Sequence, residues 1–244
     1  MKLALPRVFK QALRKLPRAT GGTAMLEMAL GMPLVLTLGG YGAELSNYAI
    51  VNQRVNQAAL QLADNGSRVG ANNGLATFQL RELDLNDVLQ GTRLAGKGIK
   101  LTTNGRITIS SLEYVQQSYD SVPVQRIHWQ RCIGARGGSG DAGYDSSYGT
   151  APTSAGSTAT QANAGTATPN GMGDAGAMVN APSGAGVIFV EVNYQYQPLF
   201  GTLFMTARKI HYIASFIVRD KRDFAQIYNP SPAATAATCD LHAA

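Results

Sequence analysis

The sequence predicts an α+β protein: a long N-terminal helix, first transmembrane and then amphipathic, followed by an antiparallel sheet domain with a disordered Gly/Ser/Ala-rich insertion. An apolar run from Ala24 to Ala43 leads into apolar positions spaced by threes and fours, which favours one continuous helix. Alternating apolar and polar residues at 187–197 and 208–219 predict two strands. The segment 134–186 has almost no large apolar side chains, which indicates the insertion.

The positive charge of the chain is concentrated at its start. The formal net charge is +6, yet 15 of the 21 lysines and arginines are balanced by the 15 acidic residues after residue 22. We therefore interpret residues 1–22 as a basic cytoplasmic leader, which resists translocation while the apolar run inserts. A basic arm for nucleic acid is the alternative, but no aromatic or Gly-Arg pattern accompanies it, and we expect no nucleic-acid partner. The leader cations are Lys2, Arg7, Lys10, Arg14, Lys15 and Arg18.

The apolar run is long enough to cross a bilayer. At about 1.5 Å per residue its length matches the hydrocarbon core, which is about 30 Å thick. Its uninterrupted part, Met28 to Gly40, would also suit the core of an ordinary signal peptide, with Gly40 and Gly42 as small residues for a cut. The positions that define the membrane helix are Ala24, Met28, Pro33, Leu36 and Ala43.

The helical pattern does not stop where a signal peptide would end. Apolar residues continue at helical spacing as far as Leu62, with polar residues between them. The sequence Asp64-Asn65-Gly66 then favours a helix end, so we predict one helix over 23–65. Pro33 lacks an amide hydrogen, so it kinks this helix, leaves a carbonyl free, or is merely tolerated.

Glu27 is the one charge in the apolar run. An acidic side chain deep in a bilayer is costly, which makes it a functional candidate. The alternative is that Glu27 lies at the interface and reaches water.

Residues 22–28, Gly-Thr-Ala-Met-Leu-Glu-Met, resemble the processing site of type IV prepilins and pseudopilins. More narrowly, residues 21–59, GGTAMLEMALGMPLVLTLGGYGAELSNYAIVNQRVNQAA, resemble the TadE-like family of tight-adherence (Flp) pilus systems. Met28 departs from the tyrosine common after the glutamate in major Flp pilins, which fits a minor pseudopilin better. The segment ARKIHYIASFIVRD, residues 207–220, is similar to the C-terminal strand of TadE-like proteins.

The resemblance implies a pilin-like fold and a processed N-terminus. A prepilin peptidase would cut after Gly22, where the missing side chain leaves the bond accessible and extended, and Thr23 would become the amino terminus. Glu27 would neutralise the amine of Thr23, its own or a neighbour's. The implied partners are the inner membrane, the prepilin peptidase, other pilins or pseudopilins and the pilus-assembly platform, with no small-molecule substrate. The implied location is the inner membrane, single-pass, with the following domain in the periplasm and incorporation into a pilus open.

Beyond the helix we expect an exported α+β domain over 66–133 and 187–228, followed by a C-terminal tail, 229–244. A short helix is predicted from Asp84 to Ala95, capped by Asp84 and with three apolar residues on one side: Leu85, Val88 and Leu89.

Four strands are predicted in that domain. The first, 106–115, changes phase at Ser110-Ser111 as a bulge would require, and the second is 122–132. The third, 187–197, should have one buried and one mostly wet face and pair antiparallel with 208–219.

The insertion at 134–186 is expected to be mobile, because it cannot bury enough apolar surface to offset its ordering entropy. It could be a displayed or glycosylated surface loop or a neutral low-complexity insertion.

The side chains give no sign of catalysis. His128, His211 and His242 are isolated and lack metal-ligand spacing, and the sequence has no serine elbow or phosphate loop. We expect no catalytic residue, no metal and no cofactor. Cys132 and Cys239 are compatible with one disulfide in an oxidising compartment, or with two unpaired thiols.

Two functions from different classes remain open. The first is a structural one, a TadE-like minor pseudopilin or membrane-anchored pilus-assembly component of a tight-adherence pilus or type II-like secretion system. The alternative is an exported or anchored surface binding module, adhesin-like, with an ordinary signal peptide. A periplasmic enzyme is disfavoured.

Overall fold

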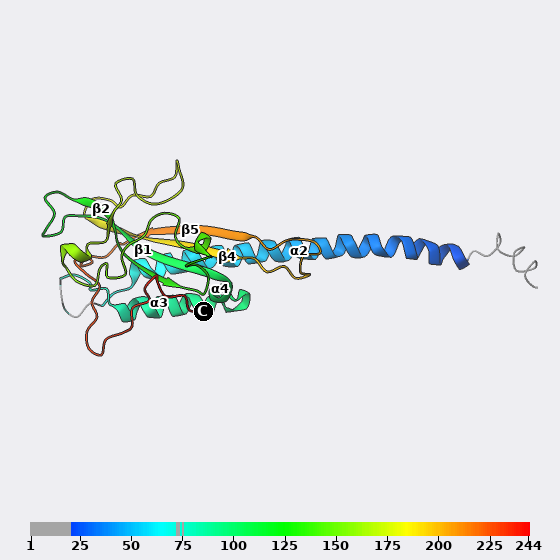
Figure 1. Cartoon of the computed structure of the whole chain (residues 1–244), viewed down its shortest axis with the longest axis horizontal. Coiled ribbons are helices and arrows are strands. Elements are labelled where there is room, and N and C mark those ends of the chain that lie inside the picture. The colour runs from blue at the N-terminus through cyan, green and yellow to red at the C-terminus, as the bar shows by residue number, and fades with distance from the viewer. Residues whose placement is uncertain (1–20, 72–73, 75) are drawn as a thin grey trace, which may run out of the picture. The chain divides into compact units, whose positions relative to one another are not determined.

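The computed structural model describes residues 21–71, 74 and 76–244 (Figure 1). The basic leader therefore lies almost wholly outside the described residues. The elements in chain order are α2 (Gly21–Arg68), α3 (Glu82–Ala95), η2 (Lys97–Ile99), α4 (Leu101–Asn104), β1 (Gly105–Val115), β2 (Val124–Ile133), η3 (Ala142–Tyr144), η4 (Gln161–Asn163), β3 (Thr166–Ala167), β4 (Ala185–Gln195) and β5 (Lys209–Ile217).

The chain divides into two compact units. The first comprises the chain up to Asn47 together with Pro198–Thr206, the connection between β4 and β5. The second comprises Tyr48–Gln197 and Ala207–Ala244, and it holds the sheet.

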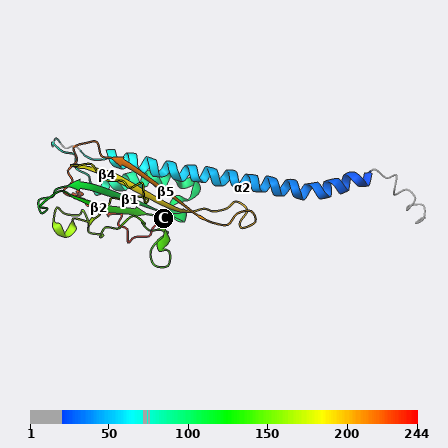
Figure 2. The same ribbon diagram turned by 90° about the horizontal axis from the view of Figure 1, so that it is seen from above.

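In the described part of the chain, five strands form one sheet in the order β3-β2-β1-β4-β5, and every neighbouring pair is antiparallel (Figure 2). The α+β class, the long N-terminal helix and the antiparallel pairing of the last two strands are thus confirmed. Pairing between β4 and β5 is regular from Val187 opposite Ile217 to Gln195 opposite Lys209.

The second half of α2 packs on the sheet, as its periodicity predicts. Its inward residues are almost completely buried: Val51, Val55, Ala58, Ala59, Leu62 and Ala63. Gly66 allows a close approach, because a Cβ atom there would come within 2.9 Å of Ile109 Cδ1 and 3.2 Å of Ile188 Cγ2. The prediction that the helix stops at Asp64-Asn65-Gly66 is wrong by a few residues, because Gly66 serves this close approach and the helix continues to Arg68.

Arg222 caps the C-terminal end of α2. Its buried guanidinium donates to the carbonyl of Gly66 at 3.3 Å, to that of Ser67 at 3.1 Å and to that of Val69 at 2.7 Å. These are the carbonyls that a helix end leaves without intrahelical partners. Burial lowers the pKa of Arg222, and nearby Asp220 opposes that shift.

The short helix begins two residues earlier than predicted. α3 starts at Glu82, and Asp84 lies in its first turn, where its carboxylate accepts a 3.1 Å hydrogen bond from the backbone amide of Arg81. Asp84 therefore caps the helix from its third residue, as the acidic residue of a capping box does. Leu85 and Leu89 are buried, as expected from their spacing.

An irregularity lies between Ser111 and Leu112, next to the predicted phase change, but the extra residue belongs to the other strand. Ser111 pairs with Trp129 and Leu112 with Ile127, which leaves His128 of β2 unpaired, whereas β1 stays in regular register with β4. The sequence pattern predicted the position of the bulge correctly but placed the extra residue in the wrong strand. In β1 the apolar side chains change from one face of the sheet to the other, and β1 itself has no extra residue.

Both faces of β4 are buried, so the prediction of a wet face is wrong. Phe189, Glu191 and Asn193 are all at most 1% exposed. The insertion covers them: Met172 and Ala181 belong to the same buried apolar cluster as Phe189, which also contains Leu112, Ile127 and Val187.

The structure does not support the disorder predicted for 134–186. The amide and hydroxyl of Ser147 donate to the Glu191 carboxylate at 2.9 to 3.2 Å, and Gln130 binds the carbonyl of Gly149 and the amide of Ala151. Polar side chains of the sheet thus hold the backbone of a segment that has few apolar residues of its own.

Candidate functional site

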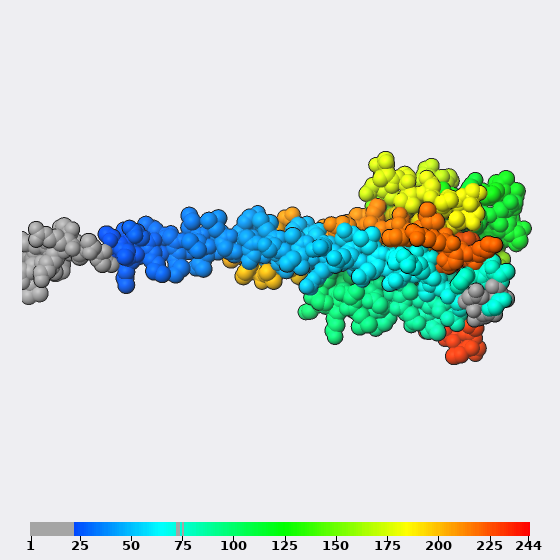
Figure 3. All heavy atoms as spheres, turned by 180° about the vertical axis from the view of Figure 1, so that it is seen from behind, coloured from blue at the N-terminus to red at the C-terminus, as the bar shows by residue number. Residues whose placement is uncertain are grey.

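The first half of α2 is a largely exposed apolar surface. Leu34, Val35 and Leu36 point in directions about 100° apart on a helix, and they are 62%, 64% and 66% exposed. Ala24, Met28, Pro33 and Ala43 are exposed as well. Figure 3 shows this stretch in blue, with side chains standing free along it.

This surface requires an apolar surrounding. A helix that is apolar all round is stable only inside a bilayer or among other helices. Within the described residues, α2 is long and apolar enough to cross a membrane, with no part of its apolar window buried.

The predicted processing residues lie in the first turns of α2. Gly22 and Thr23 are helical, so the expectation of an extended backbone at Gly22 is wrong for the uncut chain. A Cβ atom at Gly22 would meet nothing within 4 Å, and the backbone there is accessible from outside. Glu27 is exposed and follows Thr23 by four residues, which places both on one face of the helix.

α2 passes through Pro33 without interruption. Proline has no amide hydrogen, so the carbonyl of Ala29 loses its usual partner. The hydroxyl of Thr37 donates to the carbonyl of Pro33 at 2.7 Å. Of the outcomes considered for Pro33, a carbonyl without its intrahelical partner is the one that its chemistry requires.

The connection Pro198–Thr206, here called the β4–β5 loop, is fixed to α2 by Glu44. The carboxylate of Glu44 accepts hydrogen bonds from the amide of Leu199 at 3.0 and 3.3 Å and from that of Phe200 at 3.2 Å. Glu44 is completely buried. An acidic side chain directly after the apolar run therefore accepts hydrogen bonds from two loop amides that would otherwise need water as their partner.

A second contact lies one turn earlier on α2. The ring of Phe204 covers Gly40 so closely that a Cβ atom there would lie 2.5 Å from Cζ. Phe204 also meets Phe200 edge to face, with ring centroids 5.5 Å apart. Gly40 and Glu44 together form the contact site of the loop on α2, here called its seat.

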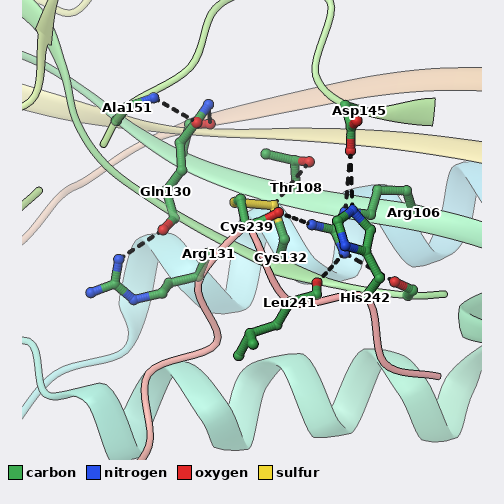
Figure 4. Close-up of a disulfide and its surroundings, with 12 residues drawn as sticks. Arg106, Thr108, Gln130, Arg131, Cys132, Asp145, Ala151, Cys239, Leu241 and His242 are labelled. Carbon is green, nitrogen blue, oxygen red and sulfur yellow. Dashed lines mark hydrogen bonds and ion pairs between the residues drawn. A yellow bond between two sulfur atoms is a disulfide. The ribbon is translucent and has the colours of Figure 1, made fainter. Parts of the chain in front are cut away.

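Cys132 and Cys239 are joined in a disulfide that ties the C-terminal tail to β2 (Figure 4). The tail also pairs through its backbone: the amide of Cys132 donates to Ala237 at 2.7 Å, and that of Gly134 donates to Ala243 at 2.9 Å. The tail is thus a bound part of the sheet domain.

Arg106 holds the same tail from β1. Its guanidinium donates to the carbonyls of Cys239 and Leu241, and to that of Gly134 at 3.0 Å (Figure 4). The residue is almost completely buried, and this burial lowers its pKa, which Asp145 opposes.

The histidines take part in polar contacts of the folded domain. His128 Nδ1 lies 2.8 Å from Glu113 Oε2, and both side chains are buried. His211 Nδ1 lies 2.7 Å from Asn193 Oδ1, and its Nε2 lies 2.9 Å from the hydroxyl of Tyr148. Burial, reinforced by a hydrogen bond to Asp174, raises the pKa of Tyr148 well above its ordinary range.

These contacts pair most of the polar atoms involved, although His128 Nε2 is buried without a hydrogen-bond partner. Among residues 21–71, 74 and 76–244, no three His, Cys, Asp or Glu side chains are grouped as a metal ion would require. A cavity of about 270 Å³ borders the disulfide and is lined by Thr108, Asp145 and His242 among others.

The residues that the sequence analysis missed are Glu44 and the β4–β5 loop. The signal was present: PLFGTLFM is unusually apolar for a connection between two strands. Its meaning depends on Glu44, which lies 155 residues earlier in the chain.

Comparison with family models finds no match for this chain, and neither curated proteins nor solved structures include one that is similar to it.

Proposed function

We propose that the chain is a structural component of a tight-adherence (Flp) pilus or related type II-like secretion system: a TadE-like minor pseudopilin, or a membrane-anchored assembly protein. Its α2 helix crosses the inner membrane with the N-terminus in the cytoplasm, and the sheet domain lies in the periplasm. It acts by packing and not by catalysis.

The observation that carries the proposal is the division of one helix into two kinds of surface. Residues from Val51 to Ala63 bury their apolar side against the sheet, whereas those from Ala24 to Ala43 expose apolar side chains in every direction. The exposed half can contact lipid while the protein lies in the membrane, and neighbouring helices once it has assembled with other subunits. It begins with Gly22 and Glu27 at the spacing of prepilin processing sites.

The disulfide agrees with this location. A bond between Cys132 and Cys239 persists in the oxidising periplasm, whereas cytoplasmic thiols are kept reduced. The positive leader supports the same orientation.

The alternative, an exported surface binding module released by an ordinary signal peptidase, requires a cut near Ala43. Such a cut would remove Gly40, on which Phe204 packs, and would place Glu44 at the new amino terminus. The seat of the β4–β5 loop therefore favours retention of the whole apolar helix.

The test is the mass of the mature protein, expressed with a prepilin peptidase and purified from membranes. Hydrolysis of the bond after Gly22 leaves a carboxylate on Gly22 and an ammonium group on Thr23, so the expected chain begins at Thr23. A start near Ala43 would show an ordinary signal peptide and support the binding module, and an intact Met1 would leave only a membrane anchor.

A pair of glycine variants sharpens this test. Gly22→Leu should block the cut, because the peptidase would have to accommodate a side chain next to the scissile bond. Gly31→Leu is the matched control: it adds the same side chain to the same helix at a position where nothing lies within 4 Å. It should be processed normally.

A further inference from the structure

The β4–β5 loop carries large apolar side chains that its own unit does not cover. Leu199, Phe200 and Leu203 are 58%, 46% and 75% exposed, whereas Phe204 lies on Gly40 of α2 and Met205 is buried. Strands of a sheet are ordinarily joined by polar turns, because exposed apolar side chains in a connection gain nothing from water.

The position of the loop along α2 is fixed by two contacts. Phe204 lies on Gly40, and the amides of Leu199 and Phe200 bind the Glu44 carboxylate. Gly40 and Glu44 are one helical turn apart and mark the end of the apolar run that begins at Ala24. The loop is thus held at the level where a membrane-spanning α2 would leave the hydrocarbon.

The side chains at this level suit the border between lipid and water. Tyr41 is 45% exposed on the neighbouring turn of α2, and aromatic residues are enriched at bilayer interfaces.

We propose that the β4–β5 loop is a second membrane contact, with Leu199, Phe200 and Leu203 inserted into the outer interface of the bilayer that α2 crosses. The occupant of this apolar patch is phospholipid. The inference rests on the membrane insertion of α2 in the proposed function.

The role of Glu44 follows from this location. Backbone amides that enter an apolar layer must be satisfied within the protein. The Glu44 carboxylate satisfies two of them at the point where the loop meets the helix. It also holds the loop in a position in which Leu199, Phe200 and Leu203 stay exposed.

The test uses the full chain in nanodiscs of phosphatidylethanolamine and phosphatidylglycerol. Both native cysteines are in the disulfide, so a single introduced cysteine can be labelled selectively with an environment-sensitive NBD fluorophore. We expect the label on Leu203→Cys to shift to the blue and to lose most of its fluorescence when lipids with a shallow nitroxide are included. Nitroxides near the bilayer centre should quench it less.

Two further positions serve as controls. Val122→Cys replaces an apolar residue of similar exposure, 61%, in the turn between β1 and β2, at the sheet end opposite to Gln195 and Lys209. Its label should remain in water and unquenched. Leu36→Cys lies in the apolar run and should be quenched most by nitroxides near the bilayer centre.

The outcomes separate the two proposals. If Leu36→Cys is quenched and Leu203→Cys behaves like Val122→Cys, the loop inference is wrong and the membrane helix stands. If the Leu203→Cys label shifts only when several copies share a disc and lipid nitroxides leave it unquenched, the patch binds a second protein copy and the lipid assignment is overturned. If neither apolar position is quenched, the insertion of α2 fails and the loop inference fails with it.

Discussion

Arg131 of β2 and Glu82 of α3 form a buried ion pair, in which Arg131 Nε donates to Glu82 Oε2 at 2.9 Å. A second hydrogen bond joins the other carboxylate oxygen to the same guanidinium, so the pair is bidentate. Both side chains are at most 4% exposed. The pair connects the first turn of α3 to β2 of the sheet.

Breaking this pair should destabilise the sheet domain strongly. Glu82→Ala leaves the Arg131 guanidinium buried without its carboxylate, and removing one partner of a buried pair costs about 3 to 5 kcal/mol. Thermal unfolding followed by circular dichroism in detergent should show a melting temperature lower by roughly 6 to 20 °C, at about 2 to 4 °C per kcal/mol for a chain of this size.

Asp87→Ala is the control for that measurement, because Asp87 is an exposed acidic residue of the same helix. It should change the melting temperature little. Equal shifts for both variants would show that the loss of charge from α3 matters and the ion pair does not.

Removing the disulfide should cost the domain much of its stability. The cysteines are separated by 107 residues, and closing a loop of about this length stabilises a fold by about 4 to 5 kcal/mol in the chain-entropy model. Urea unfolding with and without a reductant measures the difference. In the double variant Cys132→Ser/Cys239→Ser the reductant should have no effect on stability. A remaining effect would show that the reductant does not act through the disulfide.

Glu44→Ala should release the β4–β5 loop without unfolding the sheet. Hydrogen bonds to a charged acceptor contribute about 1.5 to 3 kcal/mol each, so amide hydrogen exchange at Leu199 and Phe200 should accelerate by about tenfold or more. Exchange in β4 should stay unchanged. If the loop amides exchanged at the wild-type rate in Glu44→Ala, the seat described above would not hold the loop.

Glu27→Gln should be processed but assembled poorly. The substitution keeps the shape of the side chain and removes the charge that would pair with the amine of Thr23. An interaction of about 1.5 to 3 kcal/mol predicts at least a tenfold loss of pilin-type partners that co-purify from membranes. Normal recovery of partners together with a normal Thr23 terminus would contradict the role assigned to Glu27.

Local periodicity was sufficient to predict the elements that pack through one face whose residues recur at regular spacing. The spacing of Val55, Ala59 and Leu62 predicted the side of α2 that packs on the sheet, and alternation predicted β4 and β5. Gly22 and Glu27 could be singled out because their spacing is local.

Features that depend on distant partners could not be predicted in this way. The bulge belongs to His128 because β1 keeps its register with β4, which alternation within β1 does not reveal. The burial of Glu191 depends on backbone amides of the insertion, which composition does not describe. The seat of the β4–β5 loop joins Glu44 to residues more than 150 positions away.

In the proposed topology, the closure of the tail on the sheet also sets an order of events during export. The Cys132 thiol cannot find its partner until 107 further residues have crossed the membrane, and β5 reaches β4 only late in the same passage. In that topology Cys132 would stay reduced at the outer side of the bilayer until the tail arrives. Anchorage of α2 in lipid, as proposed, would keep the newly translocated chain beside the membrane until the disulfide closes.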